Sequence, residues 1–350
     1  MIVFYIILAI LLFGVLILVH EFGHFITAKL FGVQVNEFAL FMGPAIFKKT
    51  KGETTYSLRC IPIGGYCAME GENGDSDNPR AFTRAKVWQR LIILVAGAFM
   101  NLVVGFLIVV ILAAFIWSAP ATTTVASVEA GRPFADRLQP GDELYRINGE
   151  RVYIDSDITM LLDRSESGVQ DLVVLRDGEK VTLNDVPLAR DFEDASGALR
   201  YGFGIAPGEK TVGSVLSYSW YQCVDFARMV RMGLQDLFSG RAGIDDMGGP
   251  VQVVTIAAEQ GAQASSVGVG VSYVLWLFAF IAVNLAVMNL LPIPALDGGR
   301  AVCLLLTAVI EKIIRRKLNP KYEGYLHAGF MVLLLGFMAF ITFKDIIKLF

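Results

Sequence analysis

The chain has 350 residues, of which 55% are hydrophobic and 18% are charged, and its formal net charge is −3. This composition is too apolar and too poor in charge for an ordinary soluble protein. Because there is no basic excess, we expect no nucleic acid partner. The four cysteines show neither metal-binding spacing nor a disulfide framework, and we interpret them as small apolar side chains.

Four stretches are long and apolar enough to cross a bilayer as helices. Three contain no charged residue, and the fourth contains only His327, which we expect at the membrane interface rather than at a metal. The first stretch lacks the basic start and the cleavage site of a signal peptide, so we expect it to be retained. The sequence therefore predicts a polytopic α-helical membrane protein with four transmembrane helices. The four stretches are residues 1–19, 91–118, 268–296 and 326–343.

The first apolar stretch ends in His20-Glu21-Phe22-Gly23-His24. Residues four apart share one face of a helix, so His20 and His24 can bind one metal ion, with Glu21 beside them to take a proton from water. Polar residues reaching from a helix end toward the membrane surface are the alternative. That alternative does not explain the His-Glu-x-x-His spacing, and ionisable groups within a span usually mark function. The motif predicts a metal site that still needs a third protein ligand.

Residues 33–71 alternate short apolar runs with glycine, proline and polar residues, and residues 54–59 indicate a strand between two turns. We expect a small β-hairpin whose edge can pair with an extended substrate. A plain connecting loop is equally compatible with these residues. In the second apolar stretch, Gly97 and Asn101 form a small-xxx-polar pair that suits close helix packing, with Asn101 facing protein.

Residues 119–210 indicate a soluble β-rich domain. The run Gln139-Pro140-Gly141-Asp142 forms a turn before a strand that ends at an Asn-Gly hairpin turn, residues 148–149. A helix is expected at 155–162 and a second hairpin around 177–178. Turn chemistry and strand order resemble a PDZ domain, which binds peptides by strand addition; a generic small β-rich domain is the alternative. An amphipathic helix is expected at 211–239.

The third apolar stretch ends in an unusually polar sequence. Asn284 and Asn289 precede the run Leu-Leu-Pro-Ile-Pro-Ala-Leu-Asp-Gly-Gly, residues 290–299, in which two prolines break the helix. Such a polar load is tolerated at membrane depth only where protein encloses a cavity. Asp297 can complete a His2Asp site with water in the fourth position, or it can cap a restarting helix. Asn284 or Asn289 can hydrogen-bond a substrate backbone.

Basic residues gather between the first two apolar stretches and between the last two. The positive-inside rule then places both intervals in the cytoplasm, and it places the N-terminus, residues 119–267 and the C-terminus outside. The expected organisation is an N-terminal membrane part, a PDZ-like domain, an amphipathic helix with a linker, and a C-terminal membrane part. Their ranges are 1–118, 119–210, 211–267 and 268–350.

His-Glu-Phe-Gly-His near the start and Asn-Leu-Leu-Pro-Ile-Pro-Ala-Leu-Asp-Gly-Gly near the end, with a PDZ-like domain between them, resemble the site-2 protease family of intramembrane metalloproteases. The closest likeness is to the bacterial RseP type, here with a single PDZ domain. The resemblance implies that His20, His24 and Asp297 bind one Zn²⁺ and that Glu21 is the catalytic base. It also implies that residues 33–71 form a membrane-associated β-loop that presents substrate, and that Asn289 holds the substrate backbone.

The resemblance implies regulated intramembrane proteolysis of single-span membrane proteins, such as anti-sigma factors or signal-peptide remnants. The expected location is the bacterial cell membrane, with the lipid bilayer as a partner and the PDZ-like domain extracytoplasmic. A non-catalytic membrane scaffold that gathers partners through its PDZ domain is the main alternative. A metal carrier or sensor ranks lower, because the sequence shows no further ligands along a path.

Overall fold

The computed structural model describes residues 1–72, 74, 76–165, 167–193, 199–243, 245, 247–316 and 320–348. The chain forms two compact units, one made of Met1–Ile108 with Phe226–Phe350 and the other of Val109–Asp225. Four helices in the described part of the chain are long and apolar enough to cross a membrane. The prediction of a polytopic membrane protein is therefore confirmed. These helices are Ile2–Leu30, Val87–Ile116, Val267–Asn289 and Glu323–Lys348.

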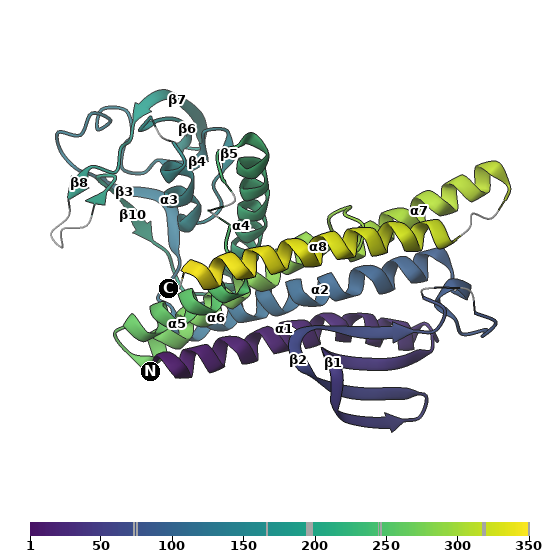
Figure 1. The fold of residues 1–350 in the computed structure, drawn as a ribbon. Helices are drawn as coiled ribbons and strands as arrows, with labels where there is room; N and C mark the ends of the chain where they lie inside the picture. Colours follow the sequence, from purple (N-terminus) through teal and green to yellow (C-terminus); the bar gives the residue numbers. More distant parts are fainter. Residues whose placement is uncertain are drawn as a thin grey trace. The chain divides into compact units, whose positions relative to one another are not determined.

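The first unit is built on α1 (Ile2–Leu30), which is apolar along most of its length. A segment of this kind folds as a helix in a bilayer because its backbone polar groups find no water there. α1 packs against α5 (Pro250–Gln263) and α6 (Val267–Asn289), around a core that includes Tyr5, Leu16 and Phe278 (Figure 1). The other long helices of this unit are α2 (Val87–Ile111), α7 (Asp297–Ile314) and α8 (Pro320–Lys348).

A β-sheet lies beside the C-terminal part of α1, as predicted for residues 33–71 (Figure 1). Its two long strands, β1 (Val35–Lys51) and β2 (Thr54–Met69), run antiparallel. The first part of β1 is central, because Phe38 pairs with Tyr56 on one side and with Cys67 on the other. Among the described residues no strand pairs with the outer side of the 65–69 segment, so this segment is an edge of the sheet.

The helix α5 lies in an interval where the sequence predicted only a linker. α5 begins at Pro250, a residue that suits the first position of a helix because its missing N–H would have no intrahelical partner. A carboxylate from the far end of the chain satisfies two other free amides. Asp345 Oδ2 on α8 accepts hydrogen bonds from the Gly249 amide at 2.9 Å and the Gln252 amide at 3.1 Å.

The second unit contains an antiparallel sheet in the order β10-β3-β4-β6-β7, with β5 paired to β4. The helix α3 (Asp155–Asp163) and the predicted strands are present. The chain then enters α4 (Val212–Ser239), the predicted amphipathic helix. The strands are β3 (Ala121–Val128), β4 (Glu143–Ile147), β5 (Glu150–Arg151), β6 (Val169–Arg176), β7 (Glu179–Pro187) and β10 (Phe203–Pro207), with the separate pair β8 (Phe192–Glu193) and β9 (Leu199–Arg200).

The turns of this sheet are those that the sequence predicted. Asn148 and Gly149 both have positive φ, 48° and 82°, as a tight hairpin requires. Asp142 anchors the Pro-Gly-Asp turn by accepting hydrogen bonds from the Gln139 amide at 2.9 Å and from Arg176 Nε at 2.7 Å. Burial alone would raise the pKa of Asp142, but these bonds hold it below its ordinary value.

Candidate active site

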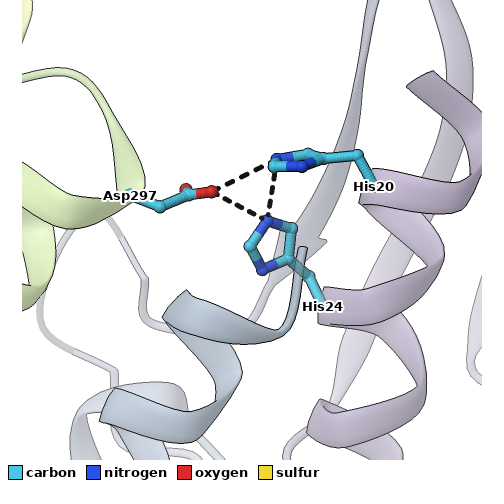
Figure 2. A group of neighbouring side chains, drawn as sticks. All are labelled: His20, His24 and Asp297. Atoms are coloured by element: carbon cyan, nitrogen blue, oxygen red, sulfur yellow. Dashed lines mark hydrogen bonds and ion pairs between the residues drawn. The ribbon is translucent and has the colours of Figure 1, made fainter. Parts of the chain in front are cut away.

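Three side chains from two distant segments meet at the C-terminal part of α1 (Figure 2). His20 and His24 project from successive turns of α1, and Asp297 reaches them from the first turn of α7. Asp297 Oδ2 lies 3.2 Å from His20 Nε2 and 3.4 Å from His24 Nε2, and the two Nε2 atoms are 3.3 Å apart. Their side chains are 14%, 8% and 18% exposed, in the order His20, His24 and Asp297.

This triangle has the size of one face of a zinc coordination tetrahedron. Bonds of about 2.0–2.1 Å from zinc to nitrogen and oxygen place any two ligand atoms about 3.3–3.4 Å apart in tetrahedral geometry. The three observed separations, 3.2, 3.3 and 3.4 Å, agree with that spacing. Three protein ligands leave the fourth vertex for water or substrate, which is the pattern of catalytic rather than structural zinc sites.

The hydrogen bonding of His24 also favours a cation at the centre of the triangle. His24 Nδ1 lies 2.8 Å from the carbonyl oxygen of Ile93, and a carbonyl can only accept. Nδ1 therefore carries the proton, and Nε2 presents a lone pair to Asp297 Oδ2, which is a buried acceptor. Two lone pairs at this distance repel each other unless a cation or a proton lies between them.

The turn between α6 and α7 brings Asp297 to this position. The helix α6 ends at Asn289, and the chain turns back through residues 290–296, where Ala295 adopts a left-handed φ of 80°. A side chain at Gly298 would collide with the backbone of Leu290, and one at Gly299 would collide with that of Ile293. The two glycines after Asp297 therefore allow the turn to fold onto the start of α7.

The alternative in which Asp297 caps a helix is not what the structure shows. The N-cap of α7 is Leu296, and Asp297 lies one residue later with its carboxylate directed at the imidazoles. Two contacts fix the turn around it. The Ala295 amide donates to His327 Nδ1 at 2.9 Å, and Arg300 forms an ion pair with Glu72 at the end of the β-hairpin. The sequence did not reveal this role of His327, because its partner is a backbone amide 32 residues away.

Glu21 lies between the two histidines in the sequence and is half-buried. Its side chain packs against a face of the sheet at Gly65 of β2. A Cβ on Gly65 would lie 3.1 Å from Cγ of Glu21 and 3.0 Å from Cγ2 of Ile17, so the 65–69 segment passes directly against α1 at the candidate site. The Glu21 side chain thus lies against the strand that forms the 65–69 edge of the sheet.

The structure leaves the two candidate substrate-binding residues outside the three-residue cluster. Asn284 and Asn289 lie in the last two turns of α6, and both are half-buried. The sequence missed the contribution of α2, whose residues Ile93, Gly97 and Asn101 surround the histidines. The sequence predicted this helix as a membrane span, and the Gly97–Asn101 spacing indicated close packing rather than a role at a site.

Comparisons with known proteins agree with the resemblance carried by the His20–His24 motif and the sequence around Asp297. Peptidase family M50 matches residues 8–337. A Clostridium perfringens protein named as a candidate zinc metalloprotease is 38% identical over 98% of each chain. The Bacillus subtilis protein named regulator of sigma-W protease RasP is 27% identical over 97% of this chain and 98% of its own, and the zinc metalloprotease RasP of Bacillus licheniformis is 28% identical. These matches confirm the resemblance to site-2 proteases, and the chain belongs to peptidase family M50.

Proposed function

We propose that this protein is an intramembrane zinc metalloendopeptidase in which His20, His24 and Asp297 hold the metal and Glu21 is the catalytic base. The observation that carries the proposal is the triangle of ligand atoms, with sides of 3.2, 3.3 and 3.4 Å, two of them from the apolar helix α1 and the third from α7. The names of the relatives support zinc as the metal.

The proposed reaction needs an activated water molecule where water is scarce. Zinc held by His20, His24 and Asp297 would polarise the scissile carbonyl and lower the pKa of a water molecule toward neutrality. The Glu21 carboxylate accepts the proton of the attacking water and then delivers it to the leaving amine. The four-residue spacing of the histidines leaves Glu21 on an adjacent face of α1, beside rather than within the ligand triangle.

The substrate must be extended at the scissile bond, because a helix hides its carbonyls in intrahelical hydrogen bonds. We propose that the 65–69 edge of β2 pairs with the unwound segment, as other proteins recognise peptides by strand addition. Its contact with α1 at Glu21 supports this assignment. Asn284 and Asn289 at the end of α6 are proposed to bind substrate backbone groups and so to offset part of the cost of unwinding.

We propose that the substrates are single-span membrane proteins of the anti-sigma-factor or signal-peptide-remnant type. The name of the Bacillus subtilis relative, regulator of sigma-W protease, supports this class. We propose the bacterial cell membrane as the location, with the 119–210 region as an extracytoplasmic PDZ-like domain. The basic residues between the first two spans and between the last two support this orientation.

The test is cleavage of a single-span polypeptide by the purified protein in detergent, with the products identified by mass spectrometry. We expect cleavage within the apolar segment, loss of activity after a chelator removes the metal, and recovery when Zn²⁺ is added back. Cleavage that survives complete metal removal would contradict a metalloprotease. Absence of cleavage in a folded, zinc-loaded protein would favour the scaffold alternative.

A further inference from the structure

One face of α2 packs against the imidazole rings of His20 and His24. Ile93, Gly97 and Asn101 are spaced four residues apart, so they lie one above another along the helix. Each contacts the imidazoles in a different way. Ile93 offers a backbone carbonyl, Gly97 offers space, and Asn101 offers a side-chain amide. Asn101 is 1% exposed, so this amide is fully enclosed by protein.

Gly97 lets both histidines approach α2. A Cβ on Gly97 would lie 2.8 Å from Cε1 of His20 and 2.8 Å from Cε1 of His24, which is too close for any real side chain. The gap also uncovers the Ile93 carbonyl, one turn earlier, so that His24 Nδ1 can donate to it at 2.8 Å. The carbonyl thereby fixes the tautomer of His24, with Nε2 free for the metal.

His20 has the corresponding contact with Asn101. Nδ2 of Asn101 lies 3.3 Å from His20 Nδ1, and the other end of the carboxamide, Oδ1, is buried with no hydrogen-bond partner among the residues that the structure describes. The oxygen and nitrogen ends of a carboxamide exchange by a half-turn of the group. With Oδ1 toward His20, it accepts the Nδ1 proton, and Nε2 of His20 presents its lone pair beside that of His24.

We infer that Asn101 is a positioning residue that selects the metal-binding tautomer of His20. The inference rests on the proposed function, because it assumes that His20 Nε2 is a zinc ligand. Zinc-bound histidines almost always donate their second N–H to an oxygen acceptor, which fixes the ring and raises its basicity as a ligand. Here α2 supplies both acceptors, a backbone carbonyl for His24 and a side-chain carbonyl for His20.

The test is the zinc dissociation constant of the full-length protein, measured by competition with a chelator. We expect Asn101→Leu, which keeps the volume but removes the acceptor, to weaken zinc binding by about 10–100-fold. Asn101→Asp keeps an oxygen acceptor and should bind zinc at least as tightly as the parent. Ser272→Ala is the matched control, because Ser272 is a buried polar residue of α6 whose hydroxyl donates to Val269 O of the same helix at 2.8 Å.

If Asn101 had only a packing role, Asn101→Leu should bind zinc more tightly than Asn101→Asp. A buried carboxylate would then be worse than leucine, so zinc binding by Asn101→Asp as weak as that of Asn101→Leu would overturn the inference. Parental affinity in Asn101→Leu would overturn it as well. The melting temperature of each metal-free variant reports its folding. If Asn101→Leu does not fold, Asn101→Ser replaces it, since the shorter hydroxyl leaves His20 Nδ1 without its partner. A parent that binds no zinc would instead contradict the proposed function.

Discussion

Replacing Glu21 with glutamine is expected to lower the rate of peptide-bond hydrolysis by about 10²–10⁴-fold while zinc stays bound. Glutamine has the size of glutamate, but it cannot accept the proton of the attacking water. Glu21 is not part of the ligand triangle of His20, His24 and Asp297, so the metal should be retained. The measurements are the turnover number with a single-span substrate and the zinc content of the same sample.

The control for this variant is Glu259→Gln, the same substitution at an exposed residue of α5. Turnover should equal that of the parent. Full activity of Glu21→Gln would remove the general base from the mechanism and would favour the scaffold alternative, in which the glutamate has no chemical task. Loss of zinc from Glu21→Gln would show that Glu21 helps to hold the metal rather than to move a proton.

Gly97→Ala is expected to weaken zinc binding by more than about 100-fold. Loss of a hydrogen bond to a zinc-bound histidine costs up to about 100-fold, and displacement of the histidine itself should cost more. The new methyl group would overlap both imidazoles, with Cε1 of each histidine only 2.8 Å away. The rings must turn aside, and at least one Nε2 then leaves the triangle. Zinc affinity by chelator competition measures the effect.

Gly105→Ala separates this local effect from a general disturbance of packing. A Cβ on Gly105 would meet Val283 Cγ2 at 2.8 Å and the carbonyl oxygen of Ala279 at 3.1 Å, so the variant crowds α2 against α6 away from the histidines. It should lower stability by about 1–3 kcal/mol and leave zinc affinity unchanged. If Gly97→Ala binds zinc as tightly as Gly105→Ala, then α2 does not shape the metal site.

The sequence predicted the features that depend on local patterns. The lengths of the apolar stretches predicted the four spans. The spacing of His20 and His24 predicted that they share a helix face, and the Asn148-Gly149 pair predicted a hairpin turn. Each of these depends on residues within a few positions of one another, where backbone geometry relates sequence to space directly.

The sequence could not predict features that depend on how distant segments meet. The alignment of α1 with α2 decides that Ile93, Gly97 and Asn101 face the imidazoles, and no local pattern encodes it. The start of α5 is capped by Asp345 from more than 90 residues away, so its first turn looked like a linker. Asp297 had two local interpretations, and the helix start at Leu296 together with the distance from Asp297 to the histidines distinguishes them.

The most direct test of the central claim is the zinc content of the purified protein beside that of Asp297→Ala. Asp297 is nearly 280 residues from the histidines in the sequence, and its oxygen lies 3.2 Å from His20 Nε2. We expect about one zinc per chain in the parent, because three such ligands form one catalytic site, and loss or strong weakening in the variant. Zinc that persists unchanged in a folded Asp297→Ala protein would contradict the three-ligand site that joins the two ends of the chain.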